Sequence, residues 1–194
     1  MRRRSLAICC VATAAIIPPP PADAARSDCY PRGTKTAEAS KDARVYTRGR
    51  SDNLRVYACL YSTGRSRPLG TNESGEFGPD SETIAGRYVA YVYFDGPTRE
   101  DKSQTQVRVI DLKTGRIRRS SDRGPGGGFG GLVVNRTGAT AWIWARGSGT
   151  EVRKIDADGE GIVDTGPADG GSLALAGSRL YWTRDGSPMT ALLH

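Results

Sequence analysis

The sequence contains little histidine: the only one among 194 residues is His194, the last residue. Chain ends are usually frayed, so a catalytic triad or a histidine-based metal site would depend on a poorly fixed residue. The carboxylate pair Glu100-Asp101 stands beside Lys102 in a polar stretch, without the fixed separation that a glycosidase needs. We therefore expect no catalytic residue, no metal site and no cofactor. An exported hydrolase or lyase that works through Asp/Glu, Tyr and Arg is the alternative.

Long apolar runs are also missing. The longest, Leu6–Ile17, has twelve residues and would span about 18 Å as a helix, against roughly 30 Å of hydrocarbon in a bilayer. Arginines precede this run, and the small residues Ala22 and Ala24 follow it, which is the order of a secretory signal peptide. We predict a signal peptide at residues 1–24 and one domain at 25–194 that is secreted or held in the cell envelope. An uncleaved anchor is the alternative, and we expect no membrane contact after cleavage.

Cysteine is scarce as well. Two of the four cysteines lie inside the predicted signal peptide, so Cys29 and Cys59 are the pair that an exported chain would keep. In an oxidising compartment these two can form only one intramolecular disulfide. Closing a loop of this length would stabilise the fold by roughly 3–4 kcal/mol. We predict a Cys29–Cys59 disulfide, with two free thiols as the alternative.

Charge of one sign does not run in long blocks. The chain carries a formal charge of +7, and removal of residues 1–24, with three Arg and one Asp, leaves +5. Because the signs alternate along the chain, a solvated surface is the plainest interpretation, and we expect no nucleic-acid partner. The basic balance favours weak attraction to acidic polymers or anionic lipid surfaces as the more specific alternative.

After the predicted signal peptide, apolar residues do not recur with the spacing of a helix, so we expect very little helix. Short hairpins, in contrast, repeat along the chain. The phrases VYACLYSTGR, VRVIDLKTGR and VRKIDADGEG each read as a strand, a turn and a second strand, with turn glycines at Gly64, Gly115 and Gly159. Upstream of each lies another pair of apolar segments, so we divide the chain into units at about 34–70, 81–121, 130–165 and 172–194. We interpret the stretches rich in Gly and Pro between the units, including 124–131, as linkers.

Four-stranded antiparallel units that repeat every 40–50 residues predict an all-β, β-propeller-like fold of about four blades, the last one incomplete. A β-sandwich is the alternative. Because stacked blades cover both faces of the middle strands, we expect the aromatic residues of these strands to pack in the core. These residues are Tyr88, Tyr91, Tyr93, Phe94, Trp142, Trp144, Tyr181 and Trp182.

The acidic segment DADGEGIVD, which begins at Asp156, has part of the spacing of a calcium loop. The twelfth position of such a loop needs a bidentate Glu, but Pro167 stands there. The segment also aligns with the hairpin that contains Asp111, where the other acids are missing. We therefore interpret it as a hairpin turn, with a weak calcium site as the alternative. We expect Asp111 and Asp156 to occupy equivalent places before their turns.

The hairpins VRVIDLKTGRIRR (107–119) and VRKIDADGEGIV (152–163) resemble the repeats of TolB-like and WD-type β-propellers of secreted bacterial proteins. Leu60 replaces the Asp in the first unit, and these families usually have six or more blades. The resemblance implies a non-enzymatic module that binds a protein or polysaccharide partner. It also leaves open self-association that would complete the propeller.

Overall fold

The computed structural model describes residues 26–50, 53–71, 82–95, 104–121, 128–147 and 149–194, so the predicted signal peptide lies outside the described residues. Apart from a short helical turn at residues 26–27, the described chain forms strands, turns and irregular segments. No helix in these ranges is long and apolar enough to cross a membrane. The expectation that helix is nearly absent is confirmed.

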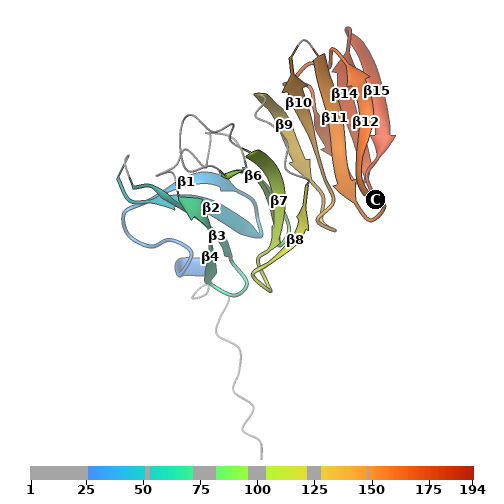
Figure 1. Ribbon diagram of the computed structural model, residues 1–194. Coiled ribbons are helices and arrows are strands. Elements are labelled where there is room, and N and C mark those ends of the chain that lie inside the picture. The colour runs from blue at the N-terminus through green and yellow to red at the C-terminus, as the bar shows by residue number, and fades with distance from the viewer. Residues whose placement is uncertain (1–25, 51–52, 72–81, 96–103, 122–127, 148) are drawn as a thin grey trace, which may run out of the picture.

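The described strands form four antiparallel sheets, each built from strands that follow one another in the chain (Figure 1). The first sheet contains β1 (Thr34–Ala39), β2 (Ala43–Arg48), β3 (Arg55–Leu60) and β4 (Arg65–Thr71). The second contains β5 (Glu82–Ala85), β6 (Tyr88–Asp95), β7 (Gln104–Asp111) and β8 (Arg116–Ser120). The third contains β9 (Gly128–Val134), β10 (Thr140–Arg146), β11 (Gly149–Asp156) and β12 (Gly159–Gly166). The fourth has three strands, β13 (Ala174–Ala176), β14 (Arg179–Arg184) and β15 (Ser187–Leu192).

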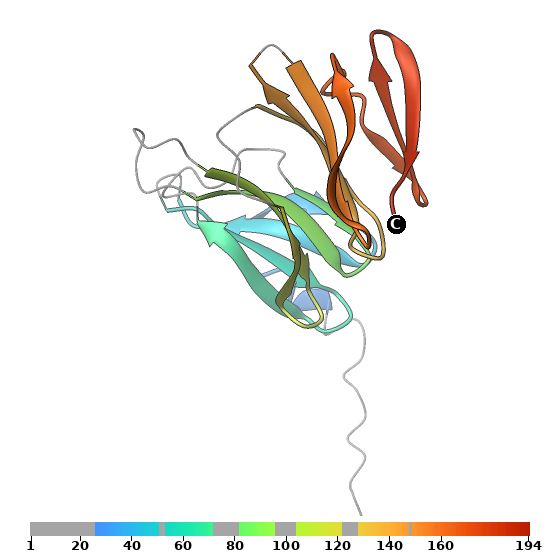
Figure 2. The ribbon, with the colours of Figure 1, turned by 45° about the vertical axis from the view of Figure 1, so that its right-hand side comes forward.

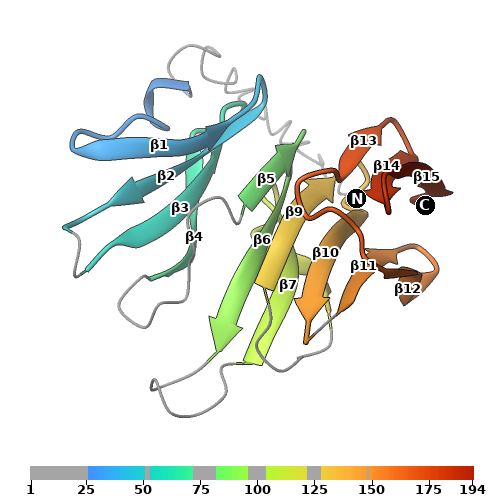
Figure 3. The same ribbon diagram turned by 90° about the horizontal axis from the view of Figure 1, so that it is seen from above.

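These sheets stand side by side in an open arc (Figure 3). The first strands of successive sheets, β1, β5, β9 and β13, contact one another in order along the inside of the arc. In the turned view of Figure 2 the fourth sheet lies at the end of the arc away from the first. The β-propeller-like prediction is confirmed, and the β-sandwich alternative is wrong because strands of different units do not interleave.

The core lies between the sheets, where apolar faces pack on one another. Buried residues of the first and second sheets form one cluster, which includes Val45, Ala58, Leu60, Val89, Ile110 and Leu112. The second and third sheets meet in two clusters, which include Tyr88, Ala90, Val109 and Val134, and Val107, Trp142 and Trp144. The third and fourth sheets meet through Ala141, Ile143, Val152, Leu180, Trp182 and Leu193.

Most of the aromatic residues expected in the core are there. Tyr88, Tyr91, Trp142, Trp144 and Trp182 are buried, and Tyr93 is partly buried. The side chain of Phe94 lies outside the described residues. The expectation is wrong for Tyr181, which is 41% exposed because it lies on the outer face of the fourth sheet, which none of the other described sheets covers.

The turn glycines are only partly equivalent. Gly64 and Gly115 end four-residue turns, and their amides donate hydrogen bonds to the carbonyls of Leu60 and Asp111. The third turn is shorter, because Asp156 pairs directly with Gly159 across two residues. Asp111 and Asp156 nevertheless occupy equivalent places, since each carboxylate accepts the amide two residues further on, at 2.9 Å. The hairpin interpretation of the acidic segment is therefore confirmed.

The glycine-rich stretch at 124–131 is not simply a linker. Its residues 128–131 belong to β9, and the others that precede them, 124–127, lie outside the described residues. At Gly130 a side chain would collide with the backbone of Gly170, since a Cβ would lie 2.6 Å from the Gly170 Cα. Glycine is needed in this strand because the segment before the fourth sheet crosses it closely.

A segment at residues 26–33 covers the outer face of the first sheet. The structure contains the Cys29–Cys59 disulfide, with an S–S distance of 1.99 Å and a Cα–Cα distance of 5.5 Å. The Arg44 guanidinium is buried beneath this segment, 4.2 Å from the ring centre of Tyr30 and 4.8 Å from that of Tyr46. It donates a hydrogen bond of 2.9 Å to the Cys29 carbonyl. The disulfide and the buried cation together hold this segment against the first sheet.

Candidate functional site: a basic hollow at the turn edge

Positive charge gathers on the first half of the molecule. Residues 26–121 include eighteen Lys and Arg against twelve Asp and Glu, a net charge of +6. Residues 122–194 hold seven Lys and Arg against eight Asp and Glu, a net charge of −1. The alternation of sign along the whole chain hides this difference, which appears when charge is counted for each sheet. The first two sheets therefore carry a positive field that attracts anions.

One edge of the arc, here named the turn edge, carries the first and third turns of each sheet. In an antiparallel sheet of consecutive strands these two turns lie at the same end. A hollow of about 610 Å³ opens there between the turns of the first and second sheets, and the β9–β10 turn reaches it from the third. It is lined by Lys41, Asp42, Leu60, Tyr61, Ser62, Thr63, Gly86, Arg87, Tyr88, Lys113 and Arg136. We name this feature the basic hollow, because it has four cations against one carboxylate.

Two of the cations are free to meet a ligand. Lys41 and Lys113 are exposed, and neither ammonium group has an ion-pair partner among the described residues. The Ser62 side chain is also exposed and has no hydrogen-bond partner in the same part of the chain. These three groups come from the β1–β2, β7–β8 and β3–β4 turns. A ligand bound between them would therefore contact both of the first two sheets.

The other two cations are held by carboxylates. The Arg87 guanidinium donates a hydrogen bond of 2.8 Å to the Tyr88 hydroxyl and lies 3.3 Å from the buried Asp111 carboxylate. The hydrogen bond to Tyr88, and then the Asp111 charge, raise the already high pKa of Arg87. Arg136 pairs with Asp42 at 3.5 Å, and its side chain is 67% exposed. Both guanidinium groups keep donors available at the mouth of the hollow.

Tyr61 forms part of the wall, and Tyr30 packs on it. The Tyr61 and Tyr30 hydroxyls are 3.0 Å apart, and the two rings stack with centres 6.1 Å apart. Burial, and then the hydrogen bond with Tyr30, raise the pKa of Tyr61 to about 12. The same hydrogen bond lowers the pKa of Tyr30. Tyr61 thus stays a neutral hydroxyl over the physiological range and adds no negative charge to the hollow.

This chemistry suits the binding of anions. The described lining has no histidine or cysteine, and its one carboxylate, Asp42, is paired with Arg136. An enzyme that works through carboxylates needs a proton donor and a base with separate environments, and the hollow does not bring two such groups together. Among the described residues, no group of three His, Cys, Asp or Glu side chains is placed to hold a metal ion.

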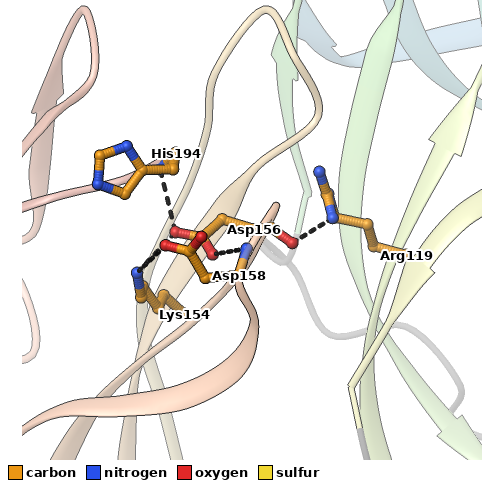
Figure 4. A network of polar contacts seen from close by, with 5 residues as sticks. All are labelled: Arg119, Lys154, Asp156, Asp158 and His194. Atoms are coloured by element: carbon orange, nitrogen blue, oxygen red, sulfur yellow. Dashed lines mark hydrogen bonds and ion pairs between the residues drawn. The ribbon is translucent and has the colours of Figure 1, made fainter.

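A second polar cluster, around Asp156, connects three sheets (Figure 4). The buried Asp156 carboxylate accepts hydrogen bonds from Lys154 Nζ at 2.7 Å, the Asp158 amide at 2.9 Å and the His194 amide at 3.0 Å. Its backbone carbonyl accepts a hydrogen bond from Arg119 of β8. Burial acts to raise the pKa of Asp156, but the hydrogen bonds outweigh it and lower the pKa below the usual value. Its groups satisfy one another, so we assign this cluster a role in stability.

The backbone shows how His194 reaches this cluster. In the first, second and fourth sheets, the backbone amide just after the third strand donates a hydrogen bond to a backbone carbonyl in the first turn of the same sheet. The Leu112 amide donates to the Arg87 carbonyl at 2.9 Å, and the Leu193 amide donates to the Ser178 carbonyl at 2.8 Å. In the third sheet the equivalent amide, that of Ala157, donates to the His194 carbonyl at 3.1 Å. The fourth sheet is thereby joined to the third by backbone as well as by side chains.

No protein-family model and no curated protein matches the chain. Solved structures that are similar to it include the following three. The β-propeller domain of the Trilobed protease from Pyrococcus furiosus, which has an open velcro topology, is 12% identical with a TM-score of 0.46, over 84% of this chain and 58% of that one. TolB from Acinetobacter baumannii is 16% identical with a TM-score of 0.41, over 81% and 42%. BamB from Moraxella catarrhalis is 15% identical with a TM-score of 0.30, over 84% and 59%.

The chain thus spans about half the length of these structures. TolB-like propellers, which its hairpins resemble in sequence, are among them. The propeller-like architecture itself rests on the order and packing of the four sheets described above.

Proposed function

We propose that the protein is an exported, non-enzymatic β-propeller-like module that binds an anionic protein or polysaccharide at the basic hollow. The observation that carries this proposal is the convergence of Lys41, Arg87, Lys113 and Arg136 on one hollow that has a single carboxylate. Three sheets contribute these cations through their turns. Propellers commonly present ligand-binding groups on loops held by a rigid scaffold, and the turn edge is such a surface.

The strength of single contacts favours a polymer or a protein surface over a small anion. An exposed ion pair contributes about 0–1 kcal/mol, because water and salt screen it. Lys41 and Lys113 alone would hold one small anion weakly, whereas a ligand with several anionic groups can engage all four cations at once. The net positive charge of the first two sheets would also steer such a ligand toward the hollow.

Export is supported by two features at the start of the chain. Residues 1–24 have the order of a signal peptide, and the Cys29–Cys59 disulfide belongs to an oxidising compartment. We expect the exported chain to begin near Ala25 and to contain no free thiol. Mass spectrometry of secreted material would measure both, and a chain that still carries Arg2–Ile17 would contradict the proposal.

Binding is tested with dextran sulfate and poly-glutamate, with uncharged dextran as the blank. The variant Lys41→Glu/Lys113→Glu reverses the two free cations. The matched control, Arg48→Glu/Arg55→Glu, makes the same charge change on exposed residues of the first sheet at its other edge. We expect the first variant to raise Kd about ten- to hundredfold and the control to raise it much less.

Two outcomes would overturn this proposal. Equal losses in the two variants would mean that net charge attracts the polyanion without a specific site. Absence of binding by the unaltered protein at low salt to either polyanion would exclude the hollow as an anion site.

A further inference from the structure

The fourth sheet has one face covered and one face open. Leu180 and Trp182 of β14 point toward the third sheet and are 0% and 4% exposed, whereas Tyr181 of β14 is 41% exposed and Leu192 of β15 is 48% exposed. Residues directly opposite each other in neighbouring strands share a face. By that register the open face, here named the end face, consists chiefly of Ala174, Ala176, Arg179, Tyr181, Thr190 and Leu192.

The end face is the equivalent of faces that are buried in the other sheets. The hydrogen bond from the Leu193 amide to Ser178 matches the one from Leu112 to Arg87, which aligns Tyr181 with Ala90 of the second sheet. Ala90 is fully buried by the third sheet. The end face therefore continues the series of sheet-to-sheet interfaces and presents mostly small and apolar side chains to the next occupant.

We propose that a second copy of this chain covers the end face, so that the fourth sheets of two copies pack face to face about a twofold axis. The opposite end of the arc cannot serve a head-to-tail contact, because residues 26–33 already cover the outer face of the first sheet and the Cys29–Cys59 disulfide holds them there. A contact between two end faces, in contrast, closes on itself about a twofold axis.

Charge sets the direction of this pairing. Arg179 is the one charged residue among the six of the end face, and it begins β14. Asp185 lies in the turn at the other end of β14, about 20 Å away at 3.3 Å per residue. Both are exposed, and neither has an ion-pair partner among the described residues. A twofold axis that runs across the strands places Arg179 of each copy near Asp185 of the other and keeps the two arginines apart.

The size of the face predicts a reversible dimer. Two strands of six residues and one of three, at about 4.8 Å per strand and about 3.3 Å per residue, cover about 240 Å². Stable interfaces usually bury about 800 Å² on each partner. We therefore expect a reversible dimer whose Kd, in the absence of any ligand, is in the micromolar range or above.

Sedimentation velocity between about 10 and 500 μM tests the proposal. The unaltered protein should sediment faster as its concentration rises, and Leu192→Asp should remove this shift. The control Ile162→Asp, at a residue of β12 that is 52% exposed, should keep it. Melting temperatures would show that both variants are folded. A protein that stays monomeric throughout, or a dimer lost with Ile162→Asp and kept with Leu192→Asp, would overturn the proposal and leave the end face to a different partner.

A charge exchange tests the orientation. Arg179→Asp alone and Asp185→Lys alone should each weaken the dimer, and the double variant should restore most of it. Dimers that weaken further in the double variant would contradict the antiparallel arrangement.

Discussion

Replacement of Asp156 by Asn tests whether one buried carboxylate holds the third and fourth sheets together. The side chain is 0% exposed, and its Oδ2 atom accepts hydrogen bonds from Lys154 Nζ and the His194 amide. In Asp156→Asn the amide group that replaces Oδ2 cannot accept, whereas Oδ1 can still bind the Asp158 amide. The variant thus removes two hydrogen bonds to a charged oxygen and keeps the shape of the side chain.

The expected cost follows from these contacts. Hydrogen bonds to a charged group contribute about 1.5–3 kcal/mol each. Lys154 is 21% exposed and has Asp158 at 3.8 Å, so it recovers part of the loss. We expect the free energy of unfolding to fall by about 3 kcal/mol, which lowers Tm by about 6–12 °C for a chain of this size. The matched control Asp158→Asn removes a carboxylate that is 68% exposed, and it should cost at most about 1 kcal/mol.

The pH dependence provides a second measurement. Because the pKa of Asp156 is lowered in the folded protein, its stabilisation is present above the ordinary carboxyl pKa of about 4 and is lost as the pH falls through the lowered value. In denaturant unfolding, the difference between the unaltered protein and Asp156→Asn should be full at pH 7 and should shrink below about pH 4. A difference under about 1 kcal/mol at pH 7, or one that does not change with pH, would refute the reasoning.

Two further predictions concern the covalent link and one turn. Replacement of both Cys29 and Cys59 by Ala should lower the free energy of unfolding by roughly 3–4 kcal/mol, measured in urea, and an unchanged value would contradict the role of the disulfide. Gly115→Ala should cost more than Gly177→Ala, although both glycines have positive φ, +72° and +62°. A Cβ at Gly115 would lie 2.7 Å from the Arg67 Cζ, whereas one at Gly177 would meet nothing within 4 Å. Equal changes in Tm would show that Arg67 moves aside freely.

The hairpins could be predicted from sequence because they depend on residues close together in the chain. Alternating and β-branched segments bounded by glycine turns specify which strands pair, and each sheet joins consecutive strands. The same local reasoning failed at Gly159, where the turn is two residues shorter than the aligned turns, and at Gly130, whose lack of a side chain serves a contact with Gly170 in a distant segment.

The candidate site was not visible in the pattern of residues. Lys41, Arg87, Lys113 and Arg136 are spread over almost a hundred residues, and each is an ordinary charged residue of a turn. The charge counted for each unit is the one signal that would have pointed to the first two sheets. Their convergence required knowledge of which turns lie at the same edge and how closely neighbouring sheets pack.

The sequence by itself determined the class of fold and the order of the strands, because pairing within a sheet follows from local periodicity and turn chemistry. It also pointed to Cys29 and Cys59 as the disulfide pair, because the other two cysteines lie inside the predicted signal peptide. Only the tertiary structure decided which faces are covered. Ala90 and Tyr181 occupy equivalent positions in their sheets, yet one is buried and the other is 41% exposed. That difference comes from the neighbouring sheet, whose position depends on packing between segments far apart in the chain.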